Sequence, residues 1–158
     1  LTQARPKVGD YPFTTLTPAL GVLDDNEKTF VIADIPGIIE GASSGRGLGL
    51  AFLKHIERTN ALLIVLDLSS GDVKGDYRTL LEELGSYSEA MLEKRRLVVL
   101  NKADLVTPDV AARWRSYLTR KGEKAVVVSA LTLAGIDDLV SAISGGVEAL
   151  RQNLTRAV

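Results

Sequence analysis

The sequence contains, at residues 97–104, the segment LVVLNKAD. Its first four residues are all apolar, and the four that follow are typical of a polar turn. A short, uninterrupted apolar run is typical of a strand that is covered on both faces of a parallel sheet. We therefore expect a buried strand at residues 97–100. Because ligands of open α/β sheets bind beyond the carboxyl ends of the strands, the turn after it is a candidate site.

Four further apolar segments predict the rest of the strands. Residues 61–66 and 125–128 are apolar throughout and predict two more strands that are covered on both faces. Residues 19–23 and 29–33 flank a short polar stretch, which predicts a β-hairpin. The strand ends of such a sheet should bring several polar turns together.

Between the later strands, apolar residues recur at the spacing of an α-helix. Apolar stripes at residues 77–91 and 136–150 predict two amphipathic helices, and residues 48–56 predict a shorter one. Thr107 and Pro108 are typical of the N-cap and the first position of another helix. The alternation of strands and helices predicts an α/β fold with a mostly parallel sheet.

The composition fits one globular domain of 158 residues, with 46% hydrophobic and 25% charged residues. The net charge of -1 comes from 19 basic and 20 acidic side chains, so we expect no direct sequence-specific DNA binding. Solvated faces explain the basic clusters at residues 94–96 and 113–121 better than nucleic-acid contact, which is the alternative. The sequence contains no apolar run of about 18 residues, so we expect no membrane-spanning helix. The absence of cysteine excludes disulfides and fits a cytoplasmic protein.

The spacing Asn-Lys-x-Asp at residues 101–104 has a chemical reason. A carboxylate at Asp104 can accept hydrogen bonds from the ring N–H and the exocyclic amine of guanine, a pair that adenine does not offer. The stem of Lys102 can lie over the flat base, and Asn101 can tie neighbouring loops together. The same residue types also suit a solvated turn. Their position after an apolar strand favours the guanine site.

Two other strand ends carry weaker signals. Asp34, after the strand at residues 29–33, is a candidate outer-shell or water-bridged partner of Mg²⁺. The backbone N–H of Gly37 could bond a terminal phosphate, since glycine permits close approach. The small residues at 129–131 would let backbone N–H groups approach the base edge. Each pattern alone also fits a turn, and each gains weight from the guanine motif.

These motifs, with DYPFTTLTPALGV at residues 10–22 and FVIADIPGIIEGASSGRGLGLAFLKHIERT at residues 30–59, make the chain resemble the GTPase domain of the Obg family of translational GTPases. The resemblance implies a three-layer, Ras-like P-loop NTPase fold and GTP hydrolysis with Mg²⁺. It also implies GTP and GDP as ligands, the large ribosomal subunit as a partner, and Thr15 and Asp34 as metal-binding residues. The nucleotide-binding residues that it implies are Phe13, Thr14, Thr15, Leu16, Thr17, Asp34, Ile35, Pro36, Gly37, Asn101, Lys102, Ala103, Asp104, Ser129, Ala130 and Leu131.

The chain departs from Ras-like proteins at two points. Ile38 stands where a glutamine would orient the attacking water, which implies slow intrinsic turnover or another way of placing the water. No lysine follows a glycine, so the phosphate-binding loop G-x-x-x-x-G-K-[ST] is absent from these residues. By the resemblance, the first strand, this loop and the first helix would precede Leu1. The missing strand would then lie between the strands at residues 29–33 and 61–66.

We therefore expect residues 1–158 to form a partial G domain, from the first switch to the last helix. Such a chain should bind GTP poorly, hydrolyse it negligibly and be unstable in isolation. A different reading is a non-catalytic, Ras-like interaction module that has lost phosphate binding. A related ATPase is disfavoured because Asp104 is placed to read guanine.

Overall fold

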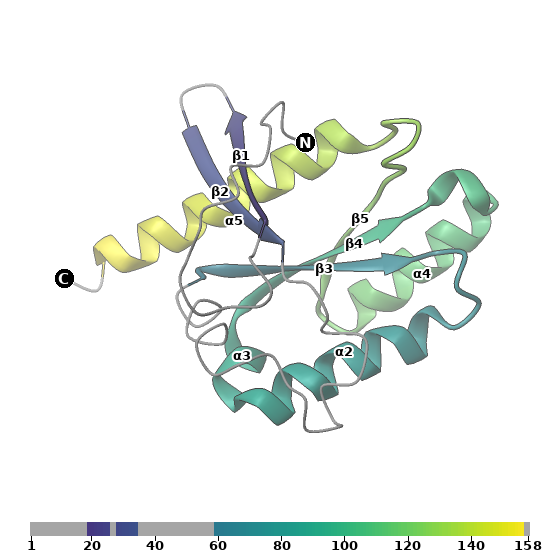
Figure 1. Cartoon of the computed structure of the whole chain (residues 1–158), viewed down its shortest axis with the longest axis horizontal. Coiled ribbons are helices and arrows are strands. Elements are labelled where there is room, and N and C mark those ends of the chain that lie inside the picture. The colour runs from purple at the N-terminus through teal and green to yellow at the C-terminus, as the bar shows by residue number, and fades with distance from the viewer. Residues whose placement is uncertain (1–18, 26–27, 35–58, 157–158) are drawn as a thin grey trace.

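The computed structural model describes residues 19–25, 28–34 and 59–156, and their strands form two separate sheets. β1 (Ala19–Asp25) and β2 (Lys28–Asp34) pair as an antiparallel hairpin. β3 (Ala61–Asp67), β4 (Arg95–Asn101) and β5 (Lys124–Val127) pair in parallel, in that order (Figure 1). The predicted hairpin and the three predicted parallel strands are confirmed, each with ends shifted by no more than a few residues.

Helices on both sides of the parallel sheet complete three layers. α2 (Val73–Tyr87), α3 (Glu89–Glu93) and α4 (Pro108–Arg120) cover one face, whereas α5 (Ile136–Arg156) and the hairpin pack on the other (Figure 1). A short 3-10 turn, η2 (Ala103–Leu105), follows β4. No helix in the described ranges is both long and apolar enough to span a membrane.

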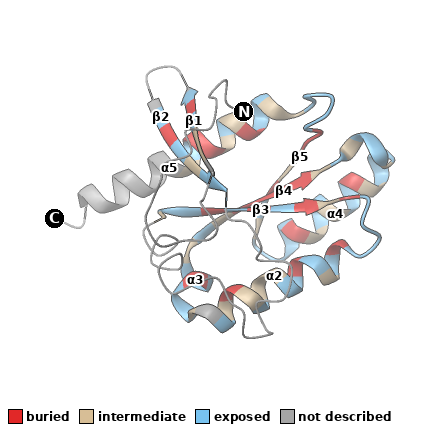
Figure 2. Cartoon of the chain, in the orientation of Figure 1, coloured by how far each residue is buried: buried red, intermediate tan, exposed pale blue. Residues whose placement is uncertain are grey.

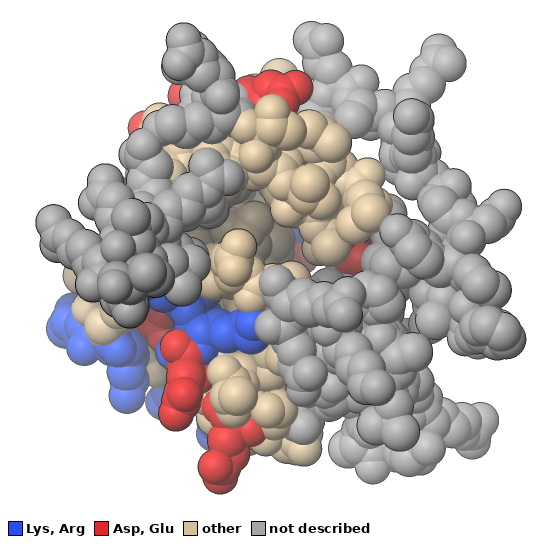
Figure 3. Space-filling view, turned by 90° about the vertical axis from the view of Figure 1, so that its left-hand side faces the viewer, with Lys and Arg blue, Asp and Glu red and all other residues tan. Residues whose placement is uncertain are grey.

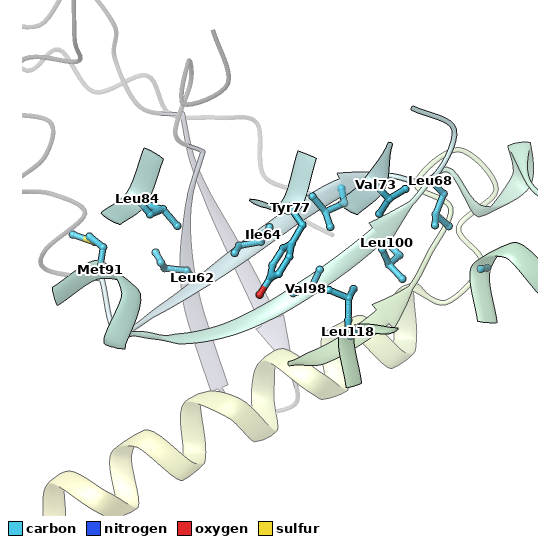
Figure 4. Close-up of a cluster of buried hydrophobic side chains, with 13 residues drawn as sticks. Leu62, Ile64, Leu68, Val73, Tyr77, Leu84, Met91, Val98, Leu100 and Leu118 are labelled. Carbon is cyan, nitrogen blue, oxygen red and sulfur yellow. The ribbon is translucent and has the colours of Figure 1, made fainter. Parts of the chain in front are cut away.

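The larger core lies between the sheet and the helices α2, α3 and α4. Leu62 and Ile64 of β3, together with Val98 of β4, meet Tyr77 of α2 in this cluster (Figure 4). The second core lies on the other face, where Leu97 and Val99 of β4 contact side chains of the hairpin and of α5. Alternate residues of β4 therefore enter opposite cores, as the uninterrupted apolar run predicts.

β3 corrects the prediction that all three parallel strands are covered on both faces. Leu62, Ile64 and Leu66 are buried, but Leu63 and Val65 on the opposite face are 36% and 53% exposed (Figure 2). The physical reason is position, because among the described elements the hairpin and α5 pack over β4 and β5 and not over this side of β3.

The two sheets separate between β2 and β3. Within the described residues β2 pairs only with β1, and β3 pairs only with β4. Exposed apolar side chains occur on both sides of this separation, at Val31 on β2 and at Val65 on β3. The resemblance implied an additional strand between these same two elements.

The observed helices differ in detail from those that the apolar periodicity predicts. The stripe at residues 77–91 is divided at Ser88, whose extended backbone ends α2 while its carbonyl accepts the Met91 N–H at 2.9 Å and opens α3. α4 begins at Pro108 as predicted, but Thr107 makes no side-chain capping hydrogen bond. α5 continues through the glycine pair at residues 145–146. The short helix predicted at residues 48–56 lies outside the described residues.

Candidate functional site

The carboxyl end of the parallel sheet is built by backbone hydrogen bonds between loops. The Leu68 N–H donates to the Asn101 carbonyl at 3.0 Å, which extends the pairing of β3 and β4 beyond Asp67. The Ala103 N–H donates to the Val128 carbonyl at 3.1 Å and joins the turn after β4 to the end of β5. The three strand ends therefore form one fixed edge, at the right of Figure 1.

Side chains bind the loop after β4 to the loop after β5. The Asn101 Oδ1 accepts the Ala130 N–H at 3.0 Å and so joins the two loops. The hydroxyl of the buried Ser129 donates to Asp104 Oδ1 at 2.5 Å, and Ser129 Oγ accepts the Thr132 N–H at 3.1 Å. Residues separated by more than twenty positions in the sequence thus share one hydrogen-bond network.

The Asp104 carboxylate is oriented by this network but remains exposed. Within the described part of the chain, the hydrogen bonds of Asp104 use only Oδ1 of its side chain. The second oxygen can therefore accept from a ligand while Ser129 holds the first. A fixed carboxylate with accepting capacity is what discrimination of a guanine edge requires.

Lys102 forms the other side of this edge. Its backbone is left-handed, with φ 62° and ψ 39°, and its Nζ lies 2.5 Å from Asp67 Oδ2. Asp67 Oδ1 accepts the N–H and the hydroxyl of Ser69 at 2.8 and 2.6 Å. The hydrogen bond from Lys102, and then those from Ser69, lower the pKa of the Asp67 carboxyl from 3.8 to about 2.

The remaining predicted residues divide into described and undescribed ones. Asp34 is exposed at the end of β2, and the contacts at the parallel-sheet edge reported above do not include it. Ala103 lies in η2, and Leu131 is exposed in the loop after β5. The other predicted residues lie outside the described ranges: Phe13, Thr14, Thr15, Leu16, Thr17, Ile35, Pro36 and Gly37.

The metal prediction concerns Thr15 and Asp34, of which only Asp34 is described. Its exposed carboxylate offers oxygen atoms that could contact Mg²⁺ through a bridging water. Among the described residues no three acidic or histidine side chains lie close enough together to hold a metal ion. The chemistry of Asp34 therefore fits the predicted role, with the other ligands to come from elsewhere.

The basic cluster at residues 94–96 is used in part within the fold. The Lys94 ammonium donates to the Thr59 carbonyl at 2.5 Å, and Arg96 pairs with Glu123 at 2.8 Å. Figure 3 shows Lys and Arg side chains directly beside Asp and Glu side chains on the face that it views. Of the three residues at 94–96 only Arg95 is exposed, so the interpretation as a solvated face fits Arg95 but is wrong for Arg96, whose side chain is 19% exposed.

Asp67 is the functional candidate that the motifs missed. It directly follows the apolar run at residues 61–66, so its place at a strand end was visible in the sequence. Its partner was not visible, because Lys102 is 35 positions away, a separation that only the parallel pairing of β3 and β4 closes.

Known proteins resemble the chain in sequence and in fold. A family model described as 50S ribosome-binding GTPase matches residues 1–102. The chain is 48% identical over 145 residues to GTPase Obg of Gloeobacter violaceus, covering 90% of this chain and 43% of that protein. It is 45% identical over 160 residues to GTPase Obg of Chlorobaculum tepidum, covering 100% and 43%. The chain thus spans less than half the length of these relatives.

A solved structure shows the same fold. Translation elongation factor SelB from Methanococcus maripaludis, crystallised with a GTP analogue, superposes with a TM-score of 0.54 at 16% identity, covering 83% of this chain and 28% of that one. At this identity the likeness concerns the fold alone. The sequence matches confirm the predicted resemblance to Obg GTPases, and the structural match confirms the predicted Ras-like α/β fold class.

Proposed function

Because the chain belongs to the family of 50S ribosome-binding GTPases, we propose that it binds GTP and GDP at the carboxyl end of its parallel sheet, as part of a GTP-hydrolysing switch. The observation that carries the proposal is the network joining Asp104 to Ser129 and Asn101 to Ala130. It holds the guanine-reading carboxylate in place before any ligand arrives, so binding does not have to order the loops.

The base would be read from its edge and from its face. The Asp104 carboxylate would accept from the ring N–H and the exocyclic amine, and the loop at residues 129–131 would border the edge of the base. The stem of Lys102 would cover the ring. A base without the two donors would leave the carboxylate unpaired, which is the costly outcome that gives selectivity.

The phosphate end would be formed by the switch residues. We propose Thr15 and Asp34 as partners of Mg²⁺ and the Gly37 N–H as a donor to the terminal phosphate, with the other residues of positions 13–17 and 35–36 around them. Mg²⁺, when bound, neutralises charge on the phosphates. The exposed carboxylate of Asp34 at the end of β2 supports its part of this assignment.

We further propose that the phosphate cradle is completed by residues outside this chain, so that the 158 residues alone bind GTP poorly. The absence of G-x-x-x-x-G-K-[ST] from the sequence supports this, as does the separation of β2 from β3 with apolar side chains exposed on both. The large ribosomal subunit is the partner that the family description favours. The alternative is a non-catalytic, Ras-like interaction module that has lost phosphate binding, and its full-length protein would hydrolyse no GTP.

Nucleotide competition on the full-length protein tests the proposal. We expect GDP to displace a fluorescent GDP analogue at concentrations at least about 100-fold lower than ADP does. Asp104→Asn should weaken GDP binding and favour XDP, because an amide donates to the carbonyl that xanthine carries in place of the amine. Asp109→Asn, which removes an exposed carboxylate in the first turn of α4, is the matched control and should leave both affinities unchanged. Equal competition by ADP and GDP would refute guanine recognition.

A further inference from the structure

An acidic side chain outside the guanine motif contacts the motif's lysine. Asp67 is the last residue of β3, and the register of the parallel pairing places it opposite Asn101 of β4. The hydrogen bond from the Leu68 N–H to the Asn101 carbonyl fixes this alignment at the strand ends. Lys102 is the next residue after Asn101, so the backbone of the sheet brings its side chain to the carboxylate of Asp67.

The carboxylate of Asp67 is itself held in one orientation. Its Oδ1 accepts two hydrogen bonds from Ser69, whereas its Oδ2 faces the Lys102 ammonium at 2.5 Å. Because the two partners use different oxygens, Ser69 orients the carboxylate without competing for the ammonium. An ion pair with one side already fixed loses less side-chain freedom than a pair of two mobile groups.

Lys102 is constrained at both of its ends. Its left-handed backbone, uncommon for a residue with a Cβ atom, sets the direction in which the side chain leaves the loop. Its ammonium is held by Asp67, yet the Lys102 side chain is 49% exposed. The aliphatic stem is therefore fixed at its two ends and open to a ligand between them.

We propose that Asp67 is a positioning residue of the guanine site, which holds the Lys102 ammonium so that the lysine stem lies ready to cover one face of the base. The inference rests on the proposed guanine-nucleotide binding. A free lysine side chain has large rotational freedom that a nucleotide would have to restrict on binding. Because the stem meets the face of the base rather than its edge, Asp67 should act equally on GDP and IDP, which differ only in the exocyclic amine.

The test compares nucleotide affinities of the full-length protein and its Asp67→Asn variant. We expect the Kd values of GDP and IDP to rise by the same factor, about 2- to 5-fold, which is the usual size for one partly exposed charged contact. Asp67→Glu should recover part of the loss, and Ser69→Ala should cause a smaller one. Asp109→Asn removes an exposed carboxylate from the start of α4 and should change neither Kd.

A double-mutant cycle separates positioning from a general structural effect. Lys102→Met keeps an unbranched stem and removes the ammonium, so Asp67→Asn should cause no further loss of affinity in that background. An equal loss in both backgrounds would overturn the inference, as would unchanged or tighter GDP binding by Asp67→Asn. The inference would also be overturned if Asp67→Asn lowered the unfolding temperature so far that unfolding alone explained its whole loss of GDP affinity. Wild-type protein that binds no GDP would instead refute the proposed function, and the inference with it.

Discussion

Removing the carboxylate of Glu123 should destabilise the protein strongly, because this side chain joins three separate elements. Its Oε1 accepts the hydroxyl of Tyr77 in α2 at 2.6 Å and two N–H groups of Arg96 in β4 at 2.8 and 3.2 Å. Glu123 itself lies in the turn between α4 and β5. The Arg96 and Glu123 side chains are only 19% and 11% exposed. Glu123→Ala would therefore leave a guanidinium and a phenol with unmade hydrogen bonds in a mostly buried place.

The magnitude follows from that burial. Breaking a fully buried ion pair costs about 3–5 kcal/mol, and an exposed pair contributes about 0–1 kcal/mol. Since this pair retains some contact with water, we expect a loss of about 3 kcal/mol in the free energy of unfolding. For a protein of this size the loss corresponds to a decrease of about 6–12 °C in the melting temperature.

Urea unfolding of the full-length protein, followed by far-UV circular dichroism, measures the change. Glu82→Ala is the matched control, since its pair with Arg78 spans 3.7 Å with both side chains 70% exposed. That variant should lose no more than about 0.5 kcal/mol beyond helix propensity. A Glu123→Ala variant as stable as the Glu82→Ala variant would refute the assignment of Glu123 as the link between α2, β4 and β5.

Two further outcomes follow from single positions. Gly135→Ala should destabilise the protein by about 2 kcal/mol or more, because its φ is 73° and an added Cβ would lie 2.3 Å from the Val127 carbonyl oxygen. Gly122→Ala, with φ 83° and open space around the added Cβ, should lose only about 1 kcal/mol, and equal losses in chemical denaturation would contradict the steric argument. Burial, and then the hydrogen bond to Glu123, raise the pKa of Tyr77 above 10.0. The unfolded chain should therefore lose this proton first as the pH rises above about 10, so that stability falls there. Tyr77→Phe should remove this part of the alkaline decline, and a difference in unfolding free energy between wild type and variant that stays constant to pH 11 would exclude the mechanism.

The local pattern of apolar and polar residues was sufficient to predict most of the described strands and helices. The apolar runs predicted the five strands found in residues 19–34 and 59–156, since a residue's own hydrophobicity determines whether it can be buried in a sheet. The hairpin of β1 and β2 and the start of α4 at Pro108 are encoded in neighbouring residues. The proposed guanine motif can be found for the same reason, because Asn101, Lys102 and Asp104 lie within four positions.

Local sequence pattern could not predict that one face of β3 is exposed or that the helix is divided at Ser88. Whether Leu63 and Val65 are buried depends on which elements pack above them, and their sequence resembles that of the fully covered β4. The periodicity at residues 77–91 continues across Ser88, although the backbone turns there to start α3.

The sequence by itself determined most strand and helix types and the resemblance to a GTPase family, and it singled out the residues proposed to bind guanine, because these depend on residue type and short spacing. Only the tertiary structure decided which side chains meet at the site. Asp67 reaches Lys102, and Ser129 reaches Asp104, through parallel strand pairing that joins distant segments. Contacts of this kind depend on the register between strands, which short-range periodicity and spacing do not specify.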